Sequence, residues 1–212
     1  MSYSLQHIAR VIQADEIPSV ERTILHLLTD SRKLVFADAT LFFAIQGPRR
    51  DGHDFITELY ERGLRSFVVQ QNKVLTDKFP QAVFLVVPDV LKALQTLAAY
   101  HRTQFNIPVI GITGSNGKTI VKEWLYQLLH TEEQIVRSPR SYNSQIGVPL
   151  SVWQLNSTHS LGIFEAGISQ QGEMDALQKI IQPTIGVWTN IGAAHAEGFN
   201  SEQEKAEEKA RL

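Results

Sequence analysis

A glycine-rich stretch between an apolar run and an amphipathic segment holds the residues whose chemistry is easiest to interpret. It has the sequence Thr-Gly-Ser-Asn-Gly-Lys-Thr over residues 113–119. Glycines let backbone N–H groups turn inward, and a helix N-terminus adds partial positive charge, so this order favours binding of a nucleotide's phosphates. Lys118 would reach the β- and γ-phosphates, and the Thr119 hydroxyl would coordinate Mg²⁺. We expect these residues to contact ATP: Thr113, Gly114, Ser115, Asn116, Gly117, Lys118 and Thr119.

The spacing of this stretch departs from the strict phosphate-loop pattern, because Ile112 stands where the pattern has its first glycine. Three further polar residues follow later apolar runs: Glu165, Asn190 and His195. In a parallel sheet, ligands collect at the carboxyl ends of the strands, where a carboxylate is the usual second Mg²⁺ anchor. Residue chemistry therefore favours Glu165 as a metal ligand but does not select His195, since Mg²⁺ prefers oxygen.

Other polar residues have no clear role from their chemistry alone. Lys209 lies in a charged helical segment, where alternating charges usually form a solvated face, and nothing distinguishes it from Lys205. In the first half of the chain, the stretches at 30–32 and 51–54 are polar loops beside apolar strands, and their Ser and Arg side chains suit phosphate or sugar contacts. Ordinary surface turns explain these loops equally well.

The elements that must position these residues follow from apolar periodicity. Helices are predicted at 4–13, 55–62, 90–104, 118–130, 172–181 and from 201 onward, where Ser-x-x-Glu forms a capping box. Strands are predicted at 40–45, 66–69, 83–87, 108–113, 134–137, 161–164 and 184–189. The predicted fold class is α/β, with a small N-terminal α/β substrate domain (1–105) and a truncated doubly wound parallel-sheet phosphate-loop domain (106–212).

The composition excludes several classes of protein. A formal net charge of −2 gives no indication of a nucleic-acid or membrane-surface partner. The absence of cysteine excludes disulfides and thiolate metal sites. No apolar run reaches the length of a membrane span, so we expect a cytoplasmic protein without membrane insertion.

These motifs together resemble the Mur ligases, the ATP-dependent amide-forming enzymes of peptidoglycan precursor synthesis. The stretch 113–119 is similar to the family's nucleotide loop, and 30–55 is similar to its N-terminal domain, which holds the UDP-sugar substrate. The resemblance implies that Asn190 belongs to the nucleotide site and that His195 helps to hold a metal. It also implies that Glu165 is the acidic metal ligand and that Lys209 is the family's carbamylated lysine, an anionic oxygen ligand for Mg²⁺.

Within the family, three details resemble the member that joins D-Ala-D-Ala to UDP-MurNAc-tripeptide: the residues at 121–123, 165–167 and 172–174. The member that adds the third residue typically has Ser-Ser-His after the acidic residue, and folate-polyglutamating relatives have Gly-Lys-Gly-Ser in the loop; neither stretch occurs here. The resemblance implies that Ser31, Arg32 and Asn143 contact substrate, although Ser144 stands where many relatives have a second asparagine.

The reaction that the resemblance implies moves the γ-phosphoryl group of ATP to the tripeptide's terminal carboxylate. The amine of D-Ala-D-Ala then attacks the acyl phosphate and releases phosphate. Thr119 and Glu165 would hold one Mg²⁺, and His195 with carbamylated Lys209 a second. The alternatives are another Mur-type amino-acid ligase and a generic phosphate-loop ATPase or kinase.

The chain ends at Leu212, before the remainder of the family's central domain and its C-terminal domain. We therefore expect a fragment that binds ligands but does not turn over alone. In some bacteria a ligase of this type is fused to an alanine racemase, so a fused parent is one expectation. A role in cell wall biogenesis, cell shape and cell division would follow from the family.

Overall fold

The computed structural model describes residues 1–48, 50–71, 78–192, 198–199 and 201–212. The chain divides into two compact units, Met1–Leu97 and Ala98–Leu212. The division falls within α3 (Val90–Thr103), ahead of the domain boundary expected between residues 105 and 106. No helix in the described part of the chain is long and apolar enough to cross a membrane.

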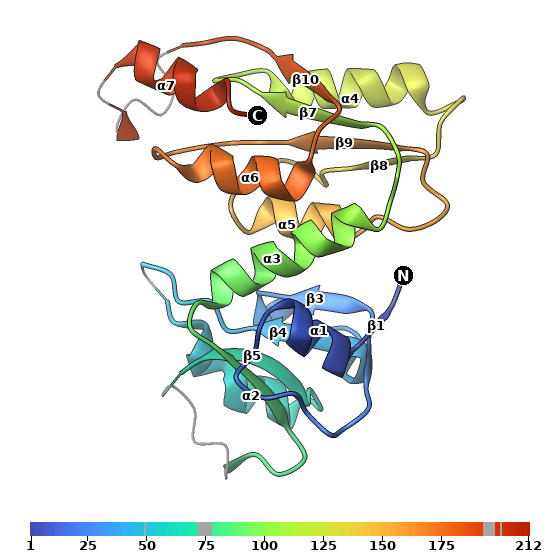
Figure 1. Ribbon diagram of the computed structural model, residues 1–212, viewed down its shortest axis with the longest axis vertical. Coiled ribbons are helices and arrows are strands. Elements are labelled where there is room, and N and C mark those ends of the chain that lie inside the picture. Colours follow the sequence, from blue (N-terminus) through green and yellow to red (C-terminus); the bar gives the residue numbers. More distant parts are fainter. Residues whose placement is uncertain (49, 72–77, 193–197, 200) are drawn as a thin grey trace. The chain divides into compact units, whose positions relative to one another are not determined.

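The first unit is built on a parallel sheet of four strands in the order β3-β4-β5-β6 (Figure 1). Stacked phenylalanines hold its core together, with the rings of Phe67 and Phe84 5.2 Å apart. The strand β3 was not predicted, because it is only three residues long and two of them are not fully buried. The strands of this unit are β1 (Tyr3–Ser4), β2 (Thr23–Ile24), β3 (His26–Leu28), β4 (Thr40–Phe43), β5 (Ser66–Gln70) and β6 (Val83–Val87). Its helices before α3 are α1 (Leu5–Val11), α2 (Ile56–Glu61) and the 3-10 turns η1 (Ser31–Lys33), η2 (Ala37–Ala39) and η3 (Gly52–Phe55).

The second unit is also a four-stranded parallel sheet, in the order β10-β7-β9-β8. Its strands are β7 (Val109–Thr113), β8 (Ile135–Arg137), β9 (Leu161–Glu165) and β10 (Ile185–Trp188). Its helices after α3 are α4 (Lys118–Leu129), α5 (Gly147–Val152), α6 (Glu173–Ile181) and α7 (Glu202–Lys209). The helix α5 was not predicted; its Pro149 lies in the first turn, where a missing N–H costs nothing.

Helices cover both faces of the second sheet, because side chains of β7 alternate between two apolar clusters. Ile110 and Ile112 pack with the α4 side chains Val121 and Leu125, whereas Val109 packs on the opposite face with residues of α5 and α6. Figure 1 shows α4 on one side of the sheet and α5 with α6 on the other. The predicted doubly wound parallel arrangement is therefore confirmed.

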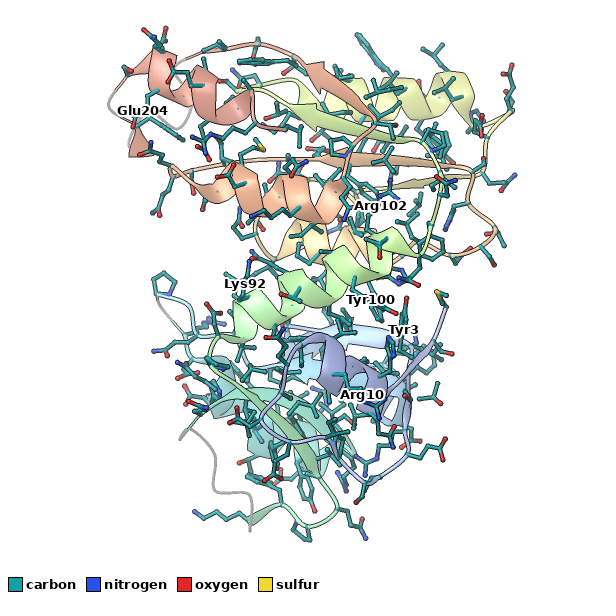
Figure 2. The ribbon with its side chains drawn as sticks, viewed as in Figure 1. Tyr3, Arg10, Lys92, Tyr100, Arg102 and Glu204 are labelled. Atoms are coloured by element: carbon teal, nitrogen blue, oxygen red, sulfur yellow. The ribbon has the colours of Figure 1, made fainter. Side chains whose placement is uncertain are left out.

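A buried arginine joins helix ends in the second unit. Arg102 of α3 donates to the carbonyl oxygens of Phe105 (2.6 Å) and Ile181 (3.0 Å), which fall at the ends of α3 and α6 (Figure 2). Its neighbour His101 is buried against Trp153 and makes a 3.0 Å hydrogen bond with the carbonyl oxygen of Leu155. Burial lowers the pKa of His101 to about 4, so the imidazole is neutral at physiological pH.

Strand register brings three strand ends to one edge of this sheet. Ile112 pairs with Glu165, and Thr113 pairs with Trp188, so β7, β9 and β10 end side by side. The loop 114–117 begins at this edge and passes directly into α4. The fold thus positions the predicted phosphate loop beside the predicted carboxylate.

Candidate nucleotide-binding site

The loop between β7 and α4 needs glycine at two positions. Gly114 has φ +141° and Gly117 has φ +80°, a region that other residues rarely adopt. A Cβ at Gly114 would also lie 2.0 Å from Thr189 Oγ1. Because Gly117 is the N-cap of α4, the unpaired N–H groups of the first helical turn open toward the loop, as an anion site requires.

The segment that follows β10 forms hydrogen bonds with the loop and holds its shape. Asn190 accepts from the backbone N–H of Ser115 through its carbonyl oxygen (2.9 Å) and from that of Asn116 through Oδ1 (2.9 Å). The Ser115 hydroxyl exchanges hydrogen bonds with the backbone of Gly192, at 3.0 and 3.2 Å. Ser115 and Asn190, both expected to contact the nucleotide, therefore have polar atoms that fix the shape of the loop.

Lys118 occupies the first position of α4 and folds back over the loop. Its Nζ donates to the Gly114 carbonyl oxygen at 2.7 Å. Burial lowers the pKa of Lys118, Glu165 opposes this shift, and Lys205 adds to it. The ammonium is thus held at the place where a phosphate against the loop would need a counter-charge.

Thr119 and Glu165 meet at the strand edge. Thr119 Oγ1 donates to Glu165 Oε2 at 3.1 Å, and Asn143 Nδ2 lies 3.4 Å from the same oxygen. The Glu165 side chain is fully buried; its Oε1 is 3.0 Å from the ammonium nitrogen of Lys122, an ion pair, and accepts no geometrically aligned hydrogen bond from the described part of the chain. A hydroxyl and a buried carboxylate are the hard oxygen ligands that Mg²⁺ takes together with phosphate and water, so this pair fits the ion. The described residues contain no cluster of three or more acidic or histidine side chains arranged around a metal.

Helix α7 brings a charged face into the unit, which corrects one expectation. Lys205, Glu208 and Lys209 are all buried, so the interpretation of this face as solvated is wrong. Each charge has a polar partner: Lys205 Nζ donates to the Gly192 carbonyl oxygen (2.7 Å), and Glu208 Oε1 accepts from the Met174 N–H (2.9 Å). The predicted Ser201 cap is confirmed, since the Ser201 hydroxyl accepts from the Glu204 N–H at 3.0 Å.

Lys209 lies at the phosphate loop. Its Nζ donates to the Gly114 carbonyl oxygen at 3.3 Å, the same oxygen that Lys118 contacts. Burial, with Lys118 and Lys205 nearby, lowers the pKa of Lys209 to about 8. The amine stays mostly protonated at pH 7, but its neutral form, which is the form that reacts as a nucleophile, is more populated than in an ordinary lysine.

Lys122 and Thr189 belong to the site but were missed as functional residues. Lys122 Nζ lies 3.0 Å from Glu165 Oε1, and Thr189 Oγ1 donates to the carbonyl oxygens of Asn116 (2.5 Å) and Thr113 (3.3 Å). Two sequence signals point to Lys122: its spacing of one helical turn from Lys118 and its place in the 121–123 stretch that resembles one family member. His195 lies outside the described residues.

The expected substrate residues fall in both units. Ser31 and Arg32 line a pocket of about 370 Å³ in the first unit, together with Asp30, Arg50 and other residues. The exposed Arg32 side chain makes two 2.8 Å hydrogen bonds with the carboxylate of Asp30, and this pairing lowers the pKa of Asp30. Asn143 instead lies beside Glu165 in the second unit.

In the second polar loop of the first unit, at residues 51–54, the polar side chains form hydrogen bonds within the unit. His53 Nδ1 lies 2.5 Å from Asp51 Oδ1, and His53 Nε2 accepts from the Gln70 N–H at 3.0 Å. Because Nε2 accepts, the hydrogen-bond pattern assigns the proton to Nδ1, which donates to Asp51. A Cβ at Gly52 would come within 2.7 Å of the backbone at Ala44, so this loop packs closely on the end of β4.

Comparison with known proteins connects both units to one family. The family model described as "Mur ligase family, catalytic domain" matches residues 23–102, and "Mur ligase middle domain" matches residues 112–212. The chain is 35% identical over 196 residues to a Bacillus subtilis protein named UDP-N-acetylmuramoyl-tripeptide–D-alanyl-D-alanine ligase, covering 92% of this chain and 42% of that protein.

Solved structures agree with this result. A crystal structure of MurF from Acinetobacter baumannii superposes with a TM-score of 0.87 at 31% identity, over 100% of this chain and 46% of that one. MurF ligase from Thermotoga maritima, in complex with ADP, gives a TM-score of 0.76 at 31% identity, over 88% of this chain and 42% of that one. The chain therefore spans less than half the length of these relatives. Both units match the family, and the chain belongs to the Mur ligases.

Proposed function

We propose that the chain supplies the substrate-binding unit and the phosphate-loop unit of an ATP-dependent ligase that joins D-Ala-D-Ala to UDP-MurNAc-tripeptide. The observation that carries this proposal is the convergence of Lys118, Thr119, Glu165 and Lys209 at one edge of the second sheet. Relatives at 35% identity are named for this reaction, and one structural neighbour holds ADP. The chain's resemblance to them supports the same substrate class.

The residues present allow specific roles to be assigned. The loop N–H groups and Lys118 would neutralise the β- and γ-phosphates as the γ-phosphoryl group moves to the tripeptide carboxylate. Thr119 and Glu165 would hold Mg²⁺, which would supply positive charge to neutralise the phosphates. Lys209 as a carbamate, with His195, would hold a second ion. The pocket at Ser31 and Arg32 would take the UDP-sugar end of the substrate.

The order of events follows from these roles. The transfer breaks the bond between the γ-phosphorus and the β–γ bridging oxygen and forms an acyl phosphate, with ADP as the leaving group. The unprotonated amine of D-Ala-D-Ala then attacks the acyl carbon, and inorganic phosphate leaves as the amide forms. Asn143, which contacts Glu165, is placed to link the metal side of the site to the bound substrate.

The test is phosphate release by the intact protein with ATP and UDP-MurNAc-tripeptide, measured across a panel of amino acceptors. Release that requires D-Ala-D-Ala supports the proposal. Release with a single amino acid would move the enzyme to another Mur-type ligase step, and release without any acceptor would indicate a phosphate-loop ATPase. A cytoplasmic location would follow from the nucleotide-linked substrates.

A further inference from the structure

Lys122 lies one helical turn after Lys118 on α4, and its side chain is completely buried (0% exposed). A buried ammonium is costly unless it is paired and hydrogen-bonded. Here Nζ donates to the carbonyl oxygen of Ser138 at 2.8 Å and to that of Arg140. The lysine therefore fixes the turn that follows β8.

Two carboxylates share the charge of this ammonium. Glu165 Oε1 lies 3.0 Å from Lys122 Nζ, and Glu123 Oε1 lies 3.2 Å from it. An ammonium has three N–H donors, and two of them are already used by backbone carbonyls. Lys122 thus has little capacity left for a ligand, and its influence on one must pass through the groups that it holds.

The most consequential of these groups is Glu165. Its two carboxylate oxygens have different neighbours: Oε1 faces Lys122, whereas Oε2 accepts from Thr119 Oγ1. A carboxylate held on one oxygen presents the other in a fixed direction. The ion pair therefore aims Oε2 at the side of the loop where Thr119 stands.

The segment after β8 contacts both the backbone and the carboxylate of Glu165. The Ser138 hydroxyl accepts from the Glu165 N–H at 3.1 Å, and Asn143 Nδ2 lies 3.4 Å from Glu165 Oε2. Arg140, between them, has a left-handed backbone (φ +51°), which its carbonyl contact with Lys122 helps to maintain. Lys122 thus connects the phosphate-loop helix, the metal-side carboxylate and the turn that leads to Asn143.

We propose that Lys122 is a positioning residue that acts through Glu165 and the 138–143 turn to set the affinity of the site for the metal–nucleotide complex. The proposal rests on the proposed function, because it assumes that Thr119 and Glu165 hold Mg²⁺ with a nucleotide.

The test is calorimetric binding of ADP by the intact protein with and without Mg²⁺. The Mg²⁺ gain is defined as the ratio of the two dissociation constants. We expect Lys122→Gln and Lys122→Met to reduce this gain at least tenfold, while ADP affinity without Mg²⁺ changes less than threefold. Lys122→Gln keeps two N–H donors in place of the ammonium, so it carries the test if Lys122→Met does not fold.

Arg102→Met is the matched control. It also removes a buried cation that donates to backbone carbonyls in the second unit, but its partners lie at the ends of α3 and α6. Thermal unfolding should show that it destabilises the unit about as much as Lys122→Met does. The control should keep the Mg²⁺ gain of the wild-type protein, which separates positioning of the metal from loss of stability.

A double-mutant cycle with Glu165→Gln tests whether Lys122 changes the Mg²⁺ gain through Glu165. If Lys122 acts through Glu165, the Lys122→Gln/Glu165→Gln variant loses no more Mg²⁺ gain than Glu165→Gln alone. Additive losses, or a Lys122→Gln variant that keeps the wild-type gain, would overturn the proposal. A wild-type protein that gains nothing from Mg²⁺ would instead overturn the proposed function, and the role of Lys122 with it.

Discussion

Two glycine-containing polar loops follow buried parallel strands in this chain, one in each unit, and they use their polar groups in opposite ways. In the loop at 51–54, His53 joins the Asp51 carboxylate to the Gln70 N–H, so the polar side chains satisfy one another. The loop at 113–119 leads into the twelve-residue helix α4 and receives charged side chains from β9 and α7.

The difference shows what separates a polar loop that only holds the fold together, here called the clasp (residues 51–54), from a polar loop that forms a binding site. Both loops have glycine, aspartate or asparagine, and a cationic or basic side chain. The first ends in a 3-10 turn, and its histidine is committed to one neighbouring strand. In the second, Lys118 and Lys209 converge on one carbonyl oxygen, and Glu165 faces the loop helix, which concentrates charge at a helix N-terminus. The binding site is therefore indicated by charged side chains that come together from several helices and strands, more than by the composition of the loop.

The largest expected effect comes from removing charge from the second loop. Lys118→Ala should reduce acceptor-dependent phosphate release at least ~100-fold, because it removes a preorganised cation from the transferring phosphoryl group. Release by the intact protein, measured at saturating ATP, checks this value. Lys179→Ala, which removes an exposed lysine from α6, is the control and should keep wild-type turnover. Near-normal release by Lys118→Ala would show that the loop does not bind the reacting phosphates.

Acid should weaken the second unit through a histidine outside the loop. The pKa of His101 is about 4 in the folded protein, against an ordinary histidine pKa of 6.5, so the unfolded chain binds more protons between these values. The contribution of His101 to stability is complete above pH 6.5 and falls as the pH drops toward 4, by up to about 3 kcal/mol.

Urea unfolding between pH 4 and 7 measures this loss. His101→Gln removes the titrating ring and keeps a donor, so its stability should depend less steeply on pH in this range. An identical pH dependence in the two proteins would assign the acid sensitivity to other groups.

A smaller effect is expected from the first loop. His53→Ala removes the imidazole that accepts from the part-buried Gln70 N–H and contacts the Asp51 carboxylate, and should lower the free energy of unfolding by about 2 kcal/mol. ADP binding should remain unchanged, because the clasp satisfies itself and belongs to the first unit. Asp54→Ala, at an exposed position in the same loop, is the control. A His53→Ala variant that loses ADP affinity but not stability would reverse the distinction between the two loops.

The smallest effect concerns the docking of α7. Glu208→Gln removes a negative charge from the N-terminus of α6 and should cost about 0.5–1 kcal/mol. Glu207→Gln, at an exposed position on the same helix, should cost less than this in the same thermal unfolding experiment. Equal values for both variants would show that the buried contact contributes nothing beyond the surface charge.

Local sequence signals predicted the parts of the fold that depend on local chemistry. The order strand, glycine loop, Lys-Thr and helix located β7 and α4, and the capping box located Ser201. The parallel sheet followed from β-branched runs alternating with helical segments, because such runs must be covered on both faces. The adjacency of Thr119 and Glu165 followed from the rule that strand carboxyl ends share an edge.

The parts of the fold and the site that were not predicted depend on tertiary packing, which local sequence patterns do not reveal. Alternating charges on α7 indicate a solvated face, yet Lys205 and Glu208 are buried because backbone groups of Gly192 and Met174 satisfy them. The 121–123 stretch is distinguished only by the family resemblance, and no pattern predicted that Lys122 is buried against the carbonyl oxygens of Ser138 and Arg140. From sequence alone, a charged side chain on a helix is predicted to lie on the surface. Its burial can be predicted only when the groups that hydrogen-bond to it, which are distant in sequence, are known.

The most direct measurement of the central claim is ADP binding by the intact protein with and without Mg²⁺, in wild type and in Thr119→Val. Valine has nearly the shape of threonine but lacks the hydroxyl that contacts Glu165. We expect Mg²⁺ to tighten ADP binding in the wild type, and we expect Thr119→Val to lose most of this gain while keeping its Mg²⁺-free affinity. Equal Mg²⁺ gains in the two proteins would contradict the assignment of the loop edge as the metal–nucleotide site.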